Sequence, residues 1–123
     1  KARKQRPITS SAQLAHLVEE VIPQRGKIHP ATRVFQALRI AVNDELGELE
    51  RALPDLVSLL APEGRLAIIS FHSLEDRIVK RFFKQEDGKT LTTITKRPMA
   101  PSQTEIKINK RARSAKLRVA QRI

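Results

Sequence analysis

The feature that most constrains the fold is a short run of four apolar residues, Leu66-Ala67-Ile68-Ile69. The run is continuous rather than alternating, which is typical of a strand buried on both faces of a parallel sheet. A turn at Pro62-Glu63-Gly64 precedes it, and a helical pattern follows it, in which Ser73 and Asp76 have the spacing of a capping box. Strand, tight turn and helix in this order predict an α/β fold.

Helical periodicity dominates the first half of the chain. Ser10 or Ser11 is predicted to cap a helix that ends before Pro23. The apolar stripe of this helix consists of Leu14, Leu17, Val18 and Val21. After a loop over residues 24–28, Pro30 suits the first position of one long helix, whose apolar side chains recur every three or four residues through Leu53. Pro54 then begins a short further helix in this prediction.

Three segments near the end are rich in β-branched side chains, namely residues 91–95, 104–108 and 116–123. The last two alternate, so they predict a terminal pair of antiparallel strands, with the first segment as a third short strand. Alternation in the last strand would place Lys116 and Arg118 on its polar face and turn Leu117 and Val119 inward.

The charge balance points to a polyanionic partner. Lysine and arginine number 24 against 13 acidic residues, a net charge of +11. Residues 1–39 and 96–123 are basic, whereas residues 40–64 are acidic. Cations that neutralise phosphates release counterions, so nucleic acid is the first candidate partner. Solvated charge runs without a partner are the alternative.

Other function classes are excluded or disfavoured. The chain has no cysteine, and the spacing of its three histidines matches no familiar metal motif, so we expect no metal site. No apolar run is long enough to span a bilayer and no signal peptide opens the chain, so we expect no membrane contact and a soluble, cytoplasmic protein. The chain starts without methionine, in a basic stretch with no apolar period, and we expect upstream sequence to be missing.

Three stretches narrow the family: residues 29–40 (HPATRVFQALRI), residues 70–82 (SFHSLEDRIVKRF) and residues 111–118 (RARSAKLR). Together they closely resemble the MraW/RsmH family of bacterial ribosomal RNA cytosine-N4 methyltransferases, over nearly the whole chain from Pro7. Two departures are visible. Glu63 stands where the family usually has a second glycine, and Lys110 where a proline usually precedes the basic motif; both concern local backbone conformation.

The resemblance implies the carboxyl-terminal half of a class I, Rossmann-like methyltransferase sheet, preceded by the end of a helical insertion domain. Residues 1–28 would end the substrate-recognition insertion, and residues 29–123 would form the returning half of the methyltransferase domain. The implied donor is S-adenosylmethionine, with its site mostly or wholly in the missing upstream half. None of the four glycines makes a cradle for it, so no cofactor-binding residue is assigned. The implied partner is 16S ribosomal RNA within the small subunit, and we also expect an exposed apolar sheet face that favours self-association, for example as a homodimer.

Substrate-pocket candidates follow the buried strand, where ligands of open α/β sheets bind. Phe71 could stack on a base, and His72 or Ser73 could hydrogen bond to it. Alternatively, Phe71 fills the core, Ser73 only caps its helix, and Glu75 with Arg77 forms a surface pair. No catalytic residue is assigned.

Candidates for contact with the RNA backbone are Arg33, Lys110, Arg111, Arg113, Lys116 and Arg118. Arg33 and Arg39 could instead pair with Asp44 or Glu45 within the fold. The rival function is a non-enzymatic basic RNA-binding or ribosome-assembly module. Such a self-sufficient module should not need a central strand buried on both faces.

Overall fold

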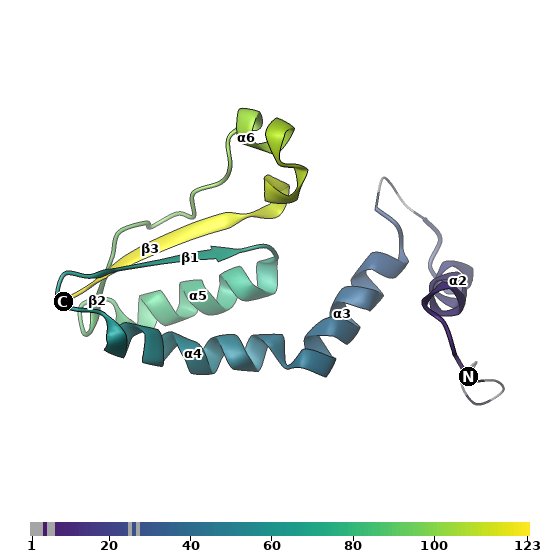
Figure 1. Cartoon of the computed structure of the whole chain (residues 1–123), viewed down its shortest axis with the longest axis horizontal. Helices are drawn as coiled ribbons and strands as arrows, with labels where there is room; N and C mark the ends of the chain where they lie inside the picture. Colours follow the sequence, from purple (N-terminus) through teal and green to yellow (C-terminus); the bar gives the residue numbers. More distant parts are fainter. Residues whose placement is uncertain (1–3, 5–6, 25, 27) are drawn as a thin grey trace. The chain divides into compact units, whose positions relative to one another are not determined.

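A computed structural model describes residues 4, 7–24, 26 and 28–123 (Figure 1). The chain divides into two compact units, residues 1–45 and residues 46–123, and each is described by itself. The loop predicted over residues 24–28 includes Arg25 and Lys27, which lie outside the described residues.

The first unit contains helices α2 (Ser11–Val21) and α3 (Ala31–Asn43). The predicted cap is confirmed, because Gln13 N donates to Ser10 Oγ at 3.2 Å. His29 links the two helices: its Nε2 lies 2.6 Å from Glu19 Oε1 on α2, and its Nδ1 accepts from Ala31 N at 3.2 Å. The unit is therefore a helix pair joined by a side-chain bridge.

The single long helix predicted from Pro30 to Leu53 is wrong, because the chain breaks at Asp44. Asp44 adopts a left-handed conformation with φ 50°, which aspartate tolerates better than most residues, and its N–H bonds to the Ile40 carbonyl to end α3. Helix α4 (Glu45–Leu59) then runs through Pro54 without a new start. Leu53 and Val57 are buried, so their burial outweighs the hydrogen bond that proline cannot make.

The second unit is built on a three-stranded sheet of β1 (Arg65–Ser70), β2 (Leu91–Thr93) and β3 (Lys116–Arg122). The strand order is β1-β3-β2, and both pairs are antiparallel. The prediction of a parallel strand buried on both faces is therefore wrong for the described chain. Leu66 is buried, but Ala67 is exposed and Ile69 is 58% exposed on the other face.

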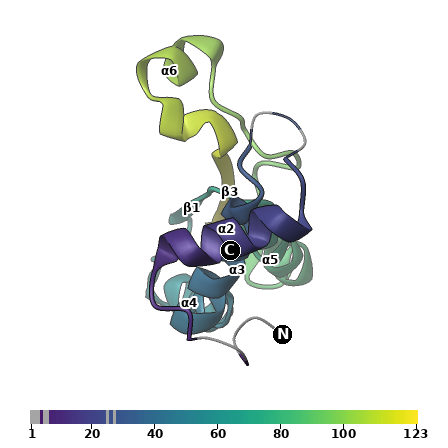
Figure 2. The ribbon, with the colours of Figure 1, turned by 90° about the vertical axis from the view of Figure 1, so that its right-hand side faces the viewer.

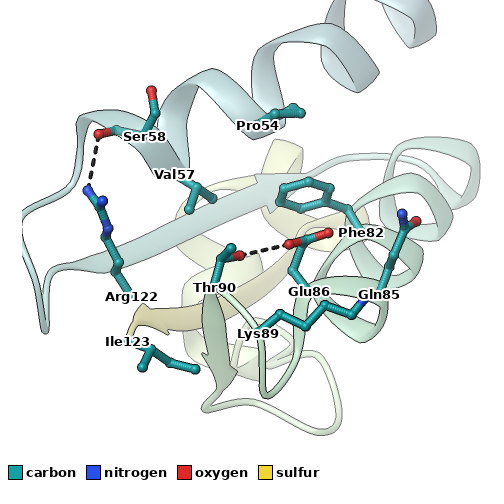
Figure 3. A pocket seen from close by; sticks show the side chains of 10 residues that line it. All are labelled: Pro54, Val57, Ser58, Phe82, Gln85, Glu86, Lys89, Thr90, Arg122 and Ile123. Carbon is teal, nitrogen blue, oxygen red and sulfur yellow. Dashed lines mark hydrogen bonds between the residues drawn. The ribbon is translucent and has the colours of Figure 1, made fainter.

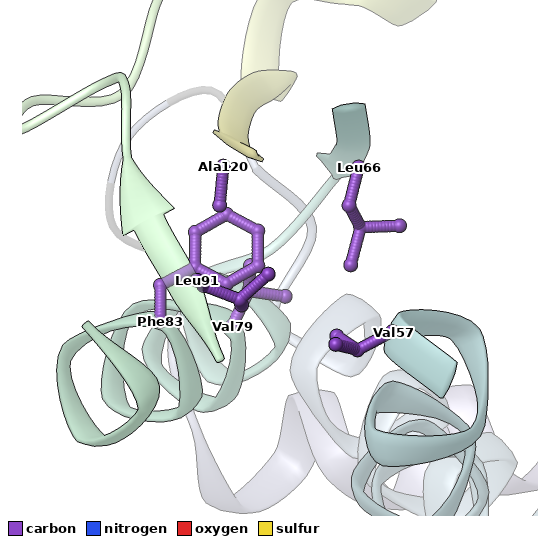
Figure 4. Packing of buried hydrophobic residues seen from close by; sticks show 6 residues of the cluster. All are labelled: Val57, Leu66, Val79, Phe83, Leu91 and Ala120. Carbon is purple, nitrogen blue, oxygen red and sulfur yellow. The ribbon is translucent and has the colours of Figure 1, made fainter. Parts of the chain in front are cut away.

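Helices cover one face of this sheet. Helix α4 and helix α5 (Ser73–Glu86) lie side by side beneath it in Figure 1. Their apolar side chains meet those of the strands in one cluster, shown in Figure 4: Val57, Leu66, Val79, Phe83, Leu91 and Ala120. The chain is thus α/β as predicted, with one covered and one bare sheet face.

Residues 103–108 form helix α6 (Gln103–Ile108), so the strand predicted over residues 104–108 is also wrong. Ser102 decides the outcome, because its Oγ accepts from Glu105 N at 3.1 Å and caps the helix start. A 3-10 helix, η1 (Lys110–Ser114), follows and leads into β3. Figure 2 shows α6 standing off the sheet.

The departure at Glu63 has a structural counterpart. Glu63 has a φ of 63°, in the left-handed region that glycine adopts without strain. Its N–H donates to the Arg122 carbonyl at 3.1 Å, which ties the turn to the end of β3. The adjacent Gly64 is required, since a Cβ there would lie 2.8 Å from the Ala61 carbonyl oxygen.

Candidate nucleic-acid interface

The turn that follows β1 presents the three predicted substrate residues at one end of the sheet. Phe71 is 55% exposed and Ser73 is exposed, whereas His72 is half-buried. The alternative that Phe71 fills the core is therefore not realised within the described chain. An exposed aromatic ring and a hydroxyl at a strand end are suited to holding a flat, polar ligand.

His72 caps α5, and the capping box is formed by His72 and Glu75 instead of the predicted Ser73 and Asp76. Glu75 N donates to His72 Nδ1 at 3.3 Å. In return, Glu75 Oε2 accepts from Phe71 N at 2.8 Å and His72 N at 3.1 Å. The carboxylate of Glu75 therefore binds the backbone of the turn. The surface pair of Glu75 with Arg77, given above as an alternative, is not what holds this carboxylate.

This cap restricts the chemistry of His72. Because Nδ1 accepts a hydrogen bond, the neutral ring carries its proton on Nε2. Nε2 is buried and lies 3.2 Å from Glu75 Oε1, without the geometry of a hydrogen bond. Nδ1 is thus engaged in the cap of α5, so His72 orients the turn.

A buried ion pair holds the same turn against β3. Arg118 Nε donates to Asp76 Oδ1 at 2.7 Å and Arg118 Nη2 donates to Oδ2 at 3.3 Å. Lys116 Nζ adds a third hydrogen bond to Oδ2 at 3.3 Å. The hydrogen bond from Arg118 is the largest cause that lowers the pKa of Asp76 below its usual value, against the raising effect of burial. Asp76 and Arg118 are 8% and 6% exposed, so this pair is part of the interior.

The phase predicted for β3 is therefore wrong, although its alternation is right. Arg118 and Ala120 are buried on the face toward α5, while Leu117 and Val119 are only half-buried on the opposite face. An arginine takes an inward position because Asp76 compensates its charge. Arg118 is consequently committed to the fold, and Lys116 is shared between Asp76 and solvent.

The sequence predicted Asp76 as part of a helix cap and not as the buried partner of Arg118, although a signal for the buried role was present. Asp76, Val79 and Phe83 recur at spacings of three and four, so the carboxylate shares the helix face that packs on the sheet. An acid on an apolar stripe needs a buried cation, and the alternating Lys116 and Arg118 were the available partners.

Three of the four remaining predicted cations lie on η1. Asn109 Oδ1 accepts from Arg111 N at 3.1 Å to begin this turn, and buried Ala112 anchors it. Lys110, Arg111 and Arg113 are exposed, and none of them forms an ion pair with a residue in the described part of the chain. Their charges are free to bind an external anion.

Strand pairing brings these two groups of candidates to the same end of the sheet (Figure 1). Ser70, the last residue of β1, is opposite Lys116, the first residue of β3. Ser70 Oγ also donates to the Lys116 carbonyl at 3.4 Å. The turn with Phe71, His72 and Ser73, here called the substrate turn, follows Ser70, and η1 precedes Lys116. The exposed ring of Phe71 and the unpaired cations of η1 therefore lie at the same end of the sheet.

Arg33 belongs to the first unit, where it is exposed on α3. Arg39, on the same helix, pairs with Glu45 through Nε at 2.7 Å and Nη2 at 3.1 Å, which confirms the alternative foreseen for it.

A cavity of about 580 Å³ opens at the other end of the sheet, as Figure 3 shows. Arg122 borders it and donates to the carbonyls of Ser58 and Leu60, while Thr90 Oγ1 donates to Glu86 Oε2 at 2.8 Å. No sequence pattern indicated this cavity. It lies near the start of β1, away from Phe71, and is therefore separate from the interface.

Within the part of the chain that the structure describes, no helix has the length and apolar content needed to cross a membrane. The expected absence of metal and of donor-binding residues remains a prediction.

Comparison with known proteins gives a consistent result. The sequence profile described as the MraW methylase family matches residues 1–123. The chain is 49% identical over 142 residues to the "Ribosomal RNA small subunit methyltransferase H" of Magnetococcus marinus, covering 100% of this chain and 45% of that protein. Proteins of the same name from Elusimicrobium minutum and Deinococcus radiodurans are 52% and 57% identical, covering 100% and 98% of this chain. The chain spans less than half the length of each relative.

Proposed function

Because the chain belongs to the MraW methylase family, we propose that the full-length protein methylates a cytidine of 16S ribosomal RNA. The proposed donor is S-adenosylmethionine, and the proposed acceptor is the exocyclic N4 amine of the base. The observation that carries the proposal is that the exposed ring of Phe71 and the unpaired cations of η1 lie at the same end of the sheet. The names of the relatives support ribosomal RNA of the small subunit as the target.

Methylation of a cytosine amine requires a surface that holds a base outside the RNA stack. The lone pair of the cytosine amine is delocalised into the ring, so the enzyme must align the amine with the methyl group and accept a proton during or after attack. The base has to leave the stack to reach the site, and a splayed base is held by stacking and by hydrogen bonds to its edge. Phe71 offers the ring and Ser73 a hydroxyl, while His72 and Glu75 keep the turn in position.

S-adenosylmethionine would supply an activated methyl group on its sulfonium. Two of the glycines have other roles, since Gly47 lies inside α4 and Gly64 is required by the turn before β1. We therefore assign no donor contact to this chain and propose that the donor site lies mostly or wholly upstream.

The bare sheet face supports the proposed domain organisation. Ala67 and Ile69 are exposed on β1, and β1 pairs only with β3 among the described strands. We propose that residues 29–123 are the returning half of a methyltransferase domain and residues 1–28 the end of its insertion. The remaining parts of the proposal are a cytoplasmic location and a homodimer.

The test is methyl transfer by the full-length protein to small ribosomal subunits, followed by nucleoside mass spectrometry of the 16S RNA. We expect N4-methylcytidine at one position. Phe71→Ala should lower the rate by about tenfold or more through loss of stacking, and Phe71→Tyr should retain most of it. RNA binding without any methyl transfer would instead favour the basic RNA-binding or ribosome-assembly module.

A further inference from the structure

Residues 100–115, here called the basic arm, form an ordered projection beside the substrate turn. The arm is closed at its base by a pair of hydrogen bonds, since Met99 N donates to Leu117 O and Leu117 N to Met99 O, each at 2.9 Å. Helix α6 and η1 lie within it and stand off the sheet (Figure 2). Asn109 N donates to the Glu105 carbonyl at 2.7 Å, which joins the two short helices. The arm is thus a folded element and not a loose tail.

The arm is strongly cationic and unpaired. It carries Lys107, Lys110, Arg111 and Arg113 but only one acid, Glu105. None of these four cations forms an ion pair with any residue that the structure describes. A surface of one charge sign on an ordered element is complementary to a phosphate backbone.

The arm also exposes a large aliphatic side chain at the end of α6. Ile108, the last residue of α6, is 84% exposed. Lys107 precedes it and Lys110 follows two residues later, so an apolar group lies within a cationic surface. Apolar side chains in such surroundings contact nucleic acid as wedges against unstacked bases.

We propose that Ile108 packs against an unstacked nucleotide next to the target base, and that Lys107 holds a neighbouring phosphate. This inference rests on the proposed function and specifies how the RNA strand beside the target is held. A base that leaves the stack deprives its neighbour of a stacking partner, and Ile108 would cover that exposed face. Its position suits this role, because η1 connects α6 to the end of the sheet that carries Phe71.

The two contacts can be separated by their salt dependence. In the full-length protein, Ile108→Ser should bind a 16S RNA transcript about tenfold more weakly with an unchanged salt slope, since it removes an apolar group and no charge. Lys107→Ala should weaken binding and reduce the slope by about 0.7, the value for one neutralised single-strand phosphate. Ile108→Phe keeps a large apolar side chain and should bind the transcript about as tightly as the unchanged protein. Leu59→Ser is the matched control, because Leu59 is 81% exposed on α4, outside the arm, and should leave RNA affinity unchanged.

Three results would overturn the proposal: RNA affinity of Ile108→Ser equal to that of the unchanged protein, a melting temperature lowered in step with affinity, or a loss of self-association. The second would mean that protein covers Ile108, and the third that a second copy does. These failures are distinct from failure of the proposed function, in which the unchanged protein itself would not methylate the RNA.

Discussion

Removing the guanidinium from the buried pair of Asp76 and Arg118 should destabilise the second unit severely. In Arg118→Met the carboxylate stays buried without its main partner, and breaking a buried pair on one side costs about 3–5 kcal/mol. Lys116 remains 3.3 Å from Asp76 and its side chain is 41% exposed, so we expect the low end, about 3 kcal/mol. For a domain of this size the melting temperature should fall by about 10–20 °C.

Urea unfolding of the single and double variants measures the pair directly. Asp76→Asn combined with Arg118→Met removes both charges, so the double variant should be less destabilised than the sum of the single variants, by about 2 kcal/mol. The same experiment over a pH series tests the cause. The folded pKa of Asp76 is lowered, so the stabilisation is present above the unfolded pKa of about 3.9 and is lost as the pH falls through the lower, folded value.

The stability difference between Arg118→Met and the unchanged chain should therefore shrink below about pH 4. Equal stability of the two proteins near neutral pH would show that the guanidinium of Arg118 does not stabilise the fold. A difference that stays constant down to strongly acidic pH would show that the loss comes from packing and not from the charge of Asp76.

Three further predictions concern the turns and the donor. His72→Ala should lower the free energy of unfolding by about 1 kcal/mol through loss of the cap, whereas His72→Asn, which can cap, should be nearly neutral in thermal melts. Glu63→Gly should raise the melting temperature, because it relieves a left-handed conformation that costs about 1 kcal/mol. A lowered melting temperature would show that contacts of the Glu63 side chain stabilise the turn by more than this conformational cost. Calorimetric titration of S-adenosylmethionine into this chain alone should show no micromolar binding, since its four glycines are isolated in the sequence and none belongs to a glycine-rich loop.

Local patterns predicted the elements whose signals agree with one another. Ser10 followed by an apolar stripe predicted α2, and the apolar run at Leu66 predicted β1. The turn after β1 and the basic residues of η1 were also selected from position and charge, although the sequence left open whether Phe71 is exposed. In each case one short-range rule was enough.

The sequence predictions were wrong where two local patterns favour different structures, or where a residue distant in the sequence determines the conformation. The apolar stripe of α3 and α4 continues across Asp44, and no periodicity reports a single left-handed residue. Residues 104–108 alternate like a strand, yet the cap at Ser102 favours a helix. Arg118 points inward only because Asp76 is on the facing helix, 42 positions away in the chain.

We propose that the end of the sheet with Phe71 and η1 binds RNA. The RNA affinity of the full-length protein, measured at several salt concentrations for the double variant Arg111→Ala/Arg113→Ala, tests this proposal. The control is Arg65→Ala/Lys89→Ala, which removes two exposed cations at the opposite end of the sheet.

We predict weaker binding and a salt slope flattened by about 0.7 for each single-strand phosphate that is no longer neutralised, with the melting temperature unchanged and the control like the unchanged protein. An unchanged slope with a lowered melting temperature would show that these arginines stabilise the fold and do not bind RNA.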